Sequence, residues 1–404
     1  MRAPTVLVTD ADRGSALAII RSLGRRGWNV IAAGEDPSCI GFRSRHVSER
    51  LVVPSPAREP QGFVERVLEA VSRRGVELIV PVTDEVILPL HEARARFNGR
   101  TRLAIPEDAD ALRAVMDKSR TLELAESLGV PTPRGLLATS PDAALRGAEL
   151  LGWPVVLKPR SSRVLHERGG IDAFVVSYAG TRDDLVESLE RLEGRCGVLM
   201  QEYCGGVGRG VGLLLHEGRP LAAFQHRRVH EVPITGGASS LRVGEALDPT
   251  LYDYSVRILG ALRWTGLAMV EFKVGDKGPK LMEVNGRVWG SLPLAVMSGV
   301  DFPALLASLY LQGPPGEGSS PQLTYRVGIR ARNLALDVTW ILTALGRRRR
   351  FPFLPTPSRR DGVAGLLALF HPRDRFDVQS LADPRPGLAE IPKILRHVWR
   401  KARG

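Results

Sequence analysis

The sequence predicts an α/β protein whose N-terminal part contains a parallel sheet. Residues 4–9 are an apolar strand, residues 16–23 follow a helical pattern, and residues 28–34 return to a strand. A strand, a helix and a second strand in this order form a βαβ unit, which favours parallel pairing. Further along, residues 267–274 and 280–286 read as two strands that flank the turn GDKGP. We therefore expect a mixed α/β (α+β) fold with a parallel sheet first and hairpins later.

The remaining elements continue this alternation of helices and strands. The predicted helices are 62–74, 107–129, 141–151, 182–193, 249–263, 292–312 and 334–345. The predicted strands are 76–82, 153–159, 173–177 and 197–203, with a hairpin over 210–225 that turns at Glu217 and Gly218. The turn at 83–85 lies at the C-terminal end of a predicted strand, which is where open α/β sheets bind ligands. A helix N-cap at Thr83 or Asp84 would explain these polar residues equally well.

The positive charge is concentrated at the C-terminus. The 404 residues carry a net charge of +12, and residues 331–404 alone account for +9. Because residues 1–330 are nearly balanced, the charge does not by itself indicate nucleic-acid binding. The three cysteines form no CxxC pair, which argues against a disulfide framework or a zinc site. We expect a reducing, cytoplasmic location.

Two glutamates in the predicted hairpin indicate a metal site. If the turn centres on Lys277, Val274 faces Lys280 and Glu271 faces Glu283. Two facing carboxylates repel each other, and their apolar neighbours increase the cost of this repulsion. A divalent cation between them would remove the conflict, and Mg²⁺ prefers such oxygen ligands. The alternative is a solvent-facing hairpin with two hydrated glutamates.

Two polar residues continue the same strand. Asn285 is two positions beyond Glu283, so it points to the same face and is a candidate third ligand. Arg287 is two positions further and could hold an anion near the metal.

Two lysines stand out because arginine supplies most of the positive charge. Lys118 and Lys158 are the only lysines in residues 1–272. A compact ammonium group suits phosphate binding. Lys158 ends an apolar strand and precedes a loop of small residues, which is a reasonable phosphate holder, although a strand-end lysine is often simply solvated. The small residues of this loop include Ser161, Gly169 and Gly170.

Taken together, these motifs resemble the ATP-grasp superfamily over residues 1–315. The matching segments are MDKSRTLELAESLGVPTP, WPVVLKP, the glycine loop, LMQEY and VEFKV…LMEVNGRVWGS. The carboxylate–amine ligases and the carbamoyl-phosphate-synthase-like branch have this arrangement. The resemblance implies a Rossmann-like pre-ATP-grasp domain at 1–110 and an ATP-grasp domain at 111–315, with an ATP-binding lobe at 118–203 and a catalytic lobe at 204–315. A linker and a basic extension would occupy 316–404.

The resemblance also implies a role for each matching residue. Contacts to the nucleotide phosphates would come from Lys118, Lys158 and the loop residues Ser161, Gly169 and Gly170. Contacts to the base or ribose would come from Glu202, Tyr203 and Cys204. Ligands to Mg²⁺ or Mn²⁺ would be Glu271, Glu283 and Asn285. Arg287 and Lys158 would stabilise the transferred phosphate.

The activity that the resemblance implies is ATP-dependent ligation. Transfer of the γ-phosphoryl group of ATP to a carboxylate gives an acyl phosphate and ADP, and an amine then displaces phosphate. The substrates would be a small carboxylate and a small amine, and no nucleic acid is expected as a partner. His226, Arg227 and Arg228 are candidates to hold a substrate carboxylate or phosphate. A kinase or carbamoyl-phosphate-type enzyme and a binding protein that acts through its basic tail are the alternatives.

The C-terminal residues end in a basic amphipathic pattern. Apolar residues recur with helical spacing at Ile391, Ile394, Leu395, Val398 and Trp399, and basic residues are interspersed among them. Such a helix either packs its apolar stripe on the enzyme body or lies on an anionic membrane or a partner. The oligomeric state stays open, with a dimer among the possibilities.

Overall fold

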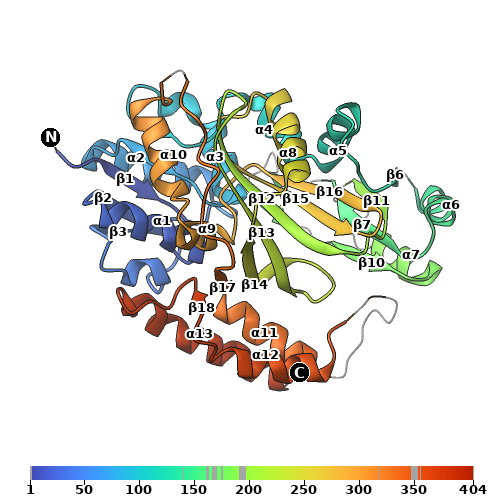
Figure 1. Cartoon of the computed structure of the whole chain (residues 1–404). Helices are drawn as coiled ribbons and strands as arrows, with labels where there is room; N and C mark the ends of the chain where they lie inside the picture. The colour runs from blue at the N-terminus through green and yellow to red at the C-terminus, as the bar shows by residue number, and fades with distance from the viewer. Residues whose placement is uncertain are drawn as a thin grey trace.

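The N-terminal part is a parallel sheet covered by helices on its faces (Figure 1). The computed structural model describes residues 2–138, 140–160, 163–165, 171–173, 176–190, 197–316, 318–346, 354 and 356–403. The sheet has the order β3-β2-β1-β4-β5, and all its pairs are parallel. Its strands are β1 (Thr5–Val8), β2 (Asn29–Gly34), β3 (Glu49–Val52), β4 (Leu78–Val80) and β5 (Arg102–Leu103), and its helices are α1 (Gly14–Arg25), η1 (Ile40–Arg43), α2 (Pro60–Arg74), α3 (Asp84–Glu92) and η2 (Arg94–Arg96). The predicted parallel βαβ unit is confirmed.

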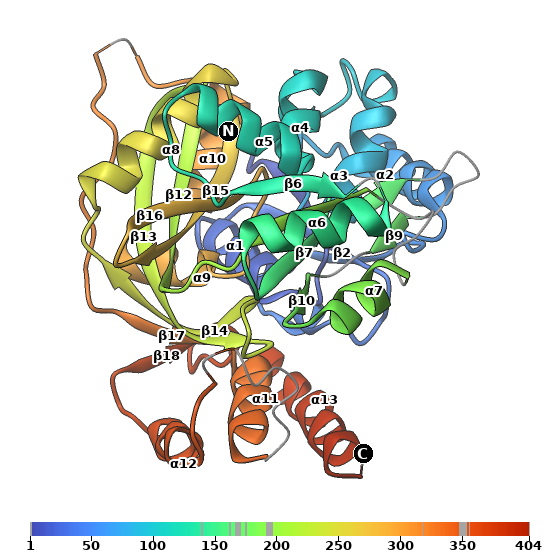
Figure 2. The same ribbon diagram turned by 90° about the vertical axis from the view of Figure 1, so that its right-hand side faces the viewer.

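A small lobe follows, with an apolar core of its own (Figure 2). Its sheet has the order β10-β7-β11-β6, and α6 packs against it. Its elements are β6 (Gly135–Ala138), α6 (Pro141–Leu151), β7 (Val155–Pro159), β10 (Ser177–Ala179), α7 (Arg182–Glu190) and β11 (Val198–Glu202), with the separate hairpin β8 (Arg163–Leu165) and β9 (Ile171–Ala173). The core contains Ala144, Leu157 and Met200, which are fully buried. This lobe carries Lys158 on β7.

The third part is a seven-stranded sheet of order β16-β15-β12-β13-β14-β17-β18. The hairpin of β12 (Val207–His216) and β13 (Arg219–Val232) turns at Glu217 and Gly218, as predicted. The other strands are β14 (Ala238–Glu245), β15 (Gly266–Gly275), β16 (Gly278–Asn285), β17 (Arg330–Arg332) and β18 (Asp374–Phe376), and the helices are α8 (Pro249–Ala261), α9 (Leu292–Ser298) and α10 (Phe302–Gln312). The predicted helix 292–312 is broken at Gly299, whose φ of 106° ends α9.

The predicted helix 107–129 is likewise two helices, α4 (Ala109–Met116) and α5 (Lys118–Ser127). The break arises because Asp117 takes an extended conformation and its side chain accepts hydrogen bonds from the backbone of Ser119 and Arg120. As a result, Lys118 lies at the first turn of a new helix, where it is almost fully buried.

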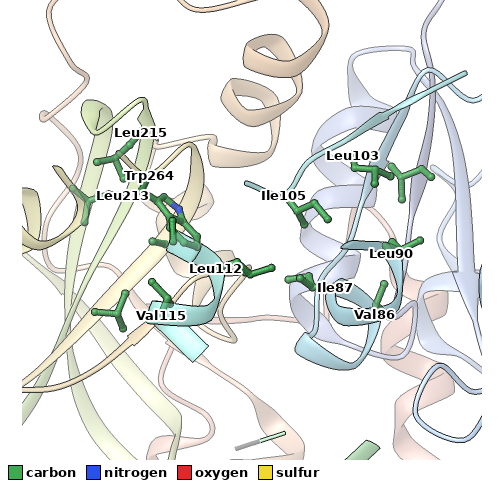
Figure 3. Close-up of a cluster of buried hydrophobic side chains, with 14 of the residues drawn as sticks. Val86, Ile87, Leu90, Leu103, Ile105, Leu112, Val115, Leu213, Leu215 and Trp264 are labelled. Atoms are coloured by element: carbon green, nitrogen blue, oxygen red, sulfur yellow. The ribbon is translucent and has the colours of Figure 1, made fainter. Parts of the chain in front are cut away.

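The main core continues from the N-terminal part into the large sheet (Figure 3). Ile87 and Leu90 of α3 belong to the same cluster as Leu112 of α4 and Trp264, which precedes β15. Leu112 lies between the two sides in Figure 3 and joins them. The two parts therefore share buried apolar surface, which stabilises their relative position. The predicted domain boundary near residue 110 stays a prediction.

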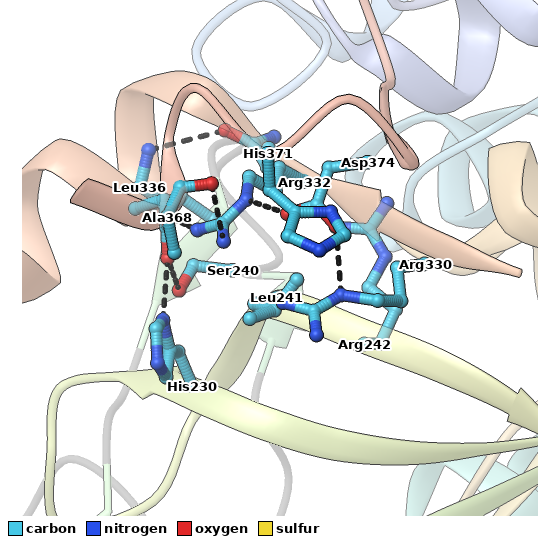
Figure 4. A network of polar contacts seen from close by, with 12 residues as sticks. His230, Ser240, Leu241, Arg242, Arg330, Arg332, Leu336, Ala368, His371 and Asp374 are labelled. Carbon is cyan, nitrogen blue, oxygen red and sulfur yellow. Dashed lines mark hydrogen bonds and ion pairs between the residues drawn. The ribbon is translucent and has the colours of Figure 1, made fainter. Parts of the chain in front are cut away.

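The C-terminal residues are built into the large sheet rather than standing apart. β17 pairs with β14, and β18 runs parallel to β17. Three helices, α11 (Leu334–Leu345), α12 (Arg359–Ala368) and α13 (Pro384–Arg403), form one side of the molecule in Figures 1 and 2. The buried side chain of Arg332 pairs with both Asp337 and Asp374, in the network of Figure 4. The predicted linker and extension at 316–404 thus contribute both strands and buried ion pairs.

No single helix in the described ranges is long and apolar enough to cross a bilayer. Helices α9 and α10 reach the necessary length and apolarity only together, and they are bent by 94° relative to each other.

Candidate functional site

The two glutamates of the predicted metal site face each other on neighbouring strands. Glu271 on β15 pairs with Glu283 on β16, as the sequence predicts. The predicted pair of Val274 and Lys280 is wrong, because Val274 pairs with Pro279. A β-bulge explains the difference, since Met282 is an extra residue on β16 between Leu281 and Glu283. Without this bulge Glu271 would face Met282, so the bulge brings the carboxylates together.

Asn285 lies between these two carboxylates. Its Nδ2 is 3.0 Å from Oε1 of Glu271 and 3.3 Å from Oε1 of Glu283. A guanidinium group also reaches Glu271, because Arg228 forms an ion pair with its other oxygen. The three predicted metal ligands therefore converge, and Arg228 is their cationic neighbour.

The charges around these carboxylates act in opposite directions on the two pKa values. Burial raises the pKa of Glu271, and the attraction of Arg228 only partly offsets this. Burial would also raise the pKa of Glu283, but Lys118 and Lys158 outweigh it and lower this pKa. Glu283 therefore holds its negative charge more readily than Glu271, and a bound cation would favour ionisation of Glu271.

The two predicted phosphate-binding lysines approach Glu283 from different elements, α5 and β7. Lys118 begins α5, and Lys158 extends from β7 with its Nζ 3.5 Å from the backbone oxygen of Met282. Burial lowers the pKa of Lys158, and Glu283 acts against this shift. Both ammonium groups thus lie beside the carboxylates, where phosphate oxygens and a metal ion would meet.

Arg287 is held by the N-terminal part of the chain. Its Nε donates to Oδ2 of Asp84 over 2.9 Å, and its Nη1 donates to the backbone oxygen of Val288. Burial would lower the pKa of Arg287, but Asp84 outweighs this and raises it. Asp84 begins α3 directly after β4, in the turn that the sequence marked as a ligand position. Thr83, the residue at the N-cap of α3, makes no capping hydrogen bond, and its hydroxyl donates to Asp10 instead.

A cavity of about 100 Å³ opens beside this cluster. Its polar lining residues are Asp84, Lys118, Thr121, Glu283, Asn285 and Arg287. These side chains come from α3, α5, β16 and the segment after it, so three parts of the chain meet at one cavity.

The predicted nucleotide-hinge residues lie at the end of β11. Glu202 pairs with Lys280, and Nε of Arg134 donates to its Oε2 over 2.8 Å. Burial would raise the pKa of Glu202, but the hydrogen bonds from Lys280 and Arg134 lower it to about 2. Tyr203 meets the ring of Tyr178 edge to face, and Cys204 is half-buried with a pKa raised by burial. The sequence did not indicate Lys280 and Arg134 as partners of Glu202, although Lys280 lies in the same β15–β16 hairpin as the two facing glutamates.

The three candidate substrate residues are separated. Only Arg228 reaches the carboxylates. Arg227 pairs with Glu245 over 2.8 Å. His226 is buried, its Nε2 lies 3.1 Å from Oγ of Ser291, and burial lowers its pKa well below the ordinary value. His226 is therefore neutral at physiological pH and does not act as a cation. Ser161, Gly169 and Gly170 lie outside the described residues.

Comparison with known proteins confirms the predicted resemblance to the ATP-grasp superfamily. The family described as "ATP-grasp in the biosynthetic pathway with Ter operon" matches residues 196–333, which include the β12–β13 and β15–β16 hairpins of the large sheet. The chain is 28% identical over 239 residues to a carbamoyl phosphate synthase large chain of Thermus thermophilus, covering 55% of this chain and 21% of that one. It is 30% identical over 205 residues to a D-alanine–D-alanine ligase of Methylococcus capsulatus, covering 47% and 64%.

A solved structure shows the same fold. The biotin carboxylase domain of the Hydrogenobacter thermophilus 2-oxoglutarate carboxylase has a TM-score of 0.62 and 19% identity, covering 82% of this chain and 74% of that one. The matches to the carbamoyl phosphate synthase and the D-alanine–D-alanine ligase span less than two thirds of the length of those proteins. They cover 21% of the synthase and 64% of the ligase. The predicted ATP-grasp fold is thereby confirmed.

Proposed function

We propose that this ATP-grasp chain is an ATP-dependent ligase that activates a carboxylate as an acyl phosphate, couples it to an amine and releases ADP and phosphate. The observation that carries the proposal is the buried pair of Glu271 and Glu283, which lies beside Asn285 and between Lys118 and Lys158. A buried carboxylate pair among cations suits a polyanionic ligand together with a metal ion. In a purely structural hairpin the same buried charges would only cost desolvation energy. The ligase and synthase relatives support this activity.

The donor set fits Mg²⁺ or Mn²⁺. Two carboxylates and an amide, all oxygen donors for this purpose, converge on one face of the β15–β16 hairpin. When bound, the metal supplies positive charge to the phosphate oxygens during transfer. The solved biotin carboxylase domain is described as a dimer in complex with MgADP, ADP and bicarbonate, which supports MgATP as the nucleotide here and a dimer as a possible assembly.

The side chains of this chain would divide the remaining work. Phosphoryl transfer needs in-line positioning and neutralisation of negative charge more than covalent participation of the protein. Lys118 and Lys158 would hold the phosphates from α5 and β7. Asp84 fixes the direction of the Arg287 guanidinium, which would meet the acyl phosphate. Glu202, locked by its two ion pairs, would present the hinge segment to the base or ribose.

The proposed location is the cytoplasm. Cys39 and Cys204, the cysteines that the structure describes, are free thiols, which supports a reducing compartment.

The test is ADP formation by the purified protein with panels of carboxylic acids and amines. A ligase forms ADP and phosphate only when both an acid and an amine are present. A kinase forms ADP with a phosphorylated acceptor alone, and a binding protein forms none. Glu283→Gln should reduce the rate at least about 100-fold with the fold intact, because it removes one of the two charges that face the metal. The matched control is Glu107→Gln, which changes an exposed glutamate and should leave the rate unchanged. Undiminished turnover in Glu283→Gln would refute the metal assignment.

A further inference from the structure

The C-terminal helix α13 carries a row of apolar side chains that face outward. Leu388, Ile391, Leu395 and Trp399 are 64%, 44%, 62% and 56% exposed. Their spacing of three and four residues places them on one face of the helix. Of the stripe predicted from the sequence, Ile394 and Val398 are half-buried, whereas the other three residues face solvent. The apolar stripe therefore does not serve mainly to pack the helix on the enzyme body.

A different set of contacts holds α13 and the segment before it in place. Arg21 of α1 pairs with Asp383 over 2.9 Å and also donates to the backbone oxygen of Val378. Asp383 accepts further hydrogen bonds from Ser44 and from the backbone of Arg45. These contacts are buried or partly buried, and they fix the start of the helix against the N-terminal part. The helix itself also packs against η1.

The charge on the helix is positive, and part of it faces carboxylates of the N-terminal part. Lys393, Arg396 and Trp399 line a hollow of about 820 Å³ together with Asp10, Asp12, Glu35, Asp36 and Glu85. The one acidic residue of the helix sequence, Glu390, is buried and accepts a hydrogen bond from Gln379 over 2.6 Å. Beyond this hollow, the helix exposes Leu388, Ile391 and Leu395 with Arg385 and without a carboxylate of its own.

Helix α12, which packs against α11 as α13 does, has the same character. Its exposed apolar side chains, with those that directly follow it, are Val363, Leu366, Leu367 and Phe370, of which Phe370 is 84% exposed. Arg359 and Arg360 at its start are exposed as well, and its first-turn carboxylate, Asp361, is occupied in a capping box with Ser358. Both helices lie on the same side of the molecule in Figures 1 and 2.

We propose that this side of the protein, led by α13, binds the surface of an anionic lipid bilayer, with the apolar row of α13 inserted at the level of the headgroups. An exposed row of leucine, isoleucine and tryptophan beside arginine is typical of helices that lie in the plane of a membrane interface. The exposed arginines outside the acidic hollow, Arg359, Arg360 and Arg385, would complement anionic headgroups. This inference does not depend on the ligase activity.

The test is cosedimentation of the full-length protein with vesicles. Vesicles of phosphatidylcholine with about one third phosphatidylglycerol should bind the protein, and vesicles of phosphatidylcholine alone should not. Binding should weaken as salt is added, because the headgroup attraction is screened. The double variant Ile391→Glu, Leu395→Glu should bind at least about tenfold more weakly, since it removes two inserted side chains and adds negative charge. Arg385→Gln should weaken binding about fivefold on the anionic vesicles, because it removes an exposed cation that lies outside the acidic hollow.

Leu150→Glu is the matched control. It changes a leucine of α6 that is 77% exposed but lies on the small lobe, and it should bind like the wild type. Equal unfolding temperatures of all variants would show that the fold is retained. Undiminished vesicle binding by the double variant, or equal binding to neutral vesicles, would overturn the proposal. A dimer that forms without vesicles and is lost in the double variant would also overturn it, by assigning the face to a second copy of the chain.

Discussion

Replacing Gly286 with alanine tests whether the segment between the proposed metal ligands and Arg287 is fixed by packing. A Cβ at this position would lie 2.4 Å from Cη2 of Trp264, where ordinary contacts begin at 3.4 Å. The backbone or the indole must therefore move by about 1 Å, and Trp264 is fully buried with no room to rotate. Overpacking of this kind costs about 1–3 kcal/mol. For a chain of 404 residues we expect the unfolding temperature to fall by about 1 to 4 °C.

The same shift should impair catalysis more than stability. Asn285 and Arg287 flank Gly286, and a displacement of about 1 Å at a reacting centre costs roughly 100-fold in rate. The assay is ADP formation at saturating substrates together with thermal unfolding. Gly290→Ala is the control, because a Cβ there meets nothing within 4 Å. If Gly286→Ala retained a rate within about threefold of Gly290→Ala, the argument that packing positions this segment would be refuted.

Two further predictions concern ion pairs away from the proposed metal ligands. Asp377→Ala leaves the buried guanidinium of Arg242 without its carboxylate. We expect the free energy of unfolding, measured by urea denaturation, to fall by about 3–5 kcal/mol. A loss below about 1 kcal/mol would contradict this expectation. Glu202→Gln should destabilise the fold in a pH-dependent way, because the pKa of Glu202 is lowered to about 2 from its ordinary value of 4.5. The ion pairs with Lys280 and Arg134 stabilise the fold fully above pH 4.5, and this stabilisation is lost as the pH falls towards 2. The difference in unfolding temperature between wild type and variant should therefore narrow between about pH 7 and about pH 3, and a constant difference would contradict the assignment.

The sequence was most informative where one residue type conflicted with its surroundings. Glu271 and Glu283 stood among apolar residues, and the two lysines stood out against a background of arginine, so all four were predicted and the structure brings them together. The register beyond the glutamates was not predictable, because the bulge at Met282 leaves no signal in the alternation of apolar and polar residues.

The C-terminal strands were missed for a related reason. β17 and β18 have three residues each and contain Arg332 and Asp374, a composition that is typical of a surface loop. Their charges are buried as pairs whose members are 42 residues apart, which no local pattern reveals. The turn that contains Asp84 was predicted as a ligand position, but the ion pair of Asp84 was not. Its partner Arg287 lies 203 residues away in the sequence, so no local pattern indicates the contact.

The separate core of the small lobe has a consequence for how the protein responds to a ligand. Lys158 belongs to this lobe, whereas Glu283 and Arg287 belong to the body that contains the main core. Main-chain connections to that body run only through the segments before β6 and after β11, and a small apolar core opens more readily than a large one. A ligand that touches both Lys158 and Glu283 fastens the two bodies together. The affinity for such a ligand is therefore coupled to the local opening of the small lobe, and a mutation that loosens the lobe should weaken binding without touching the ligand.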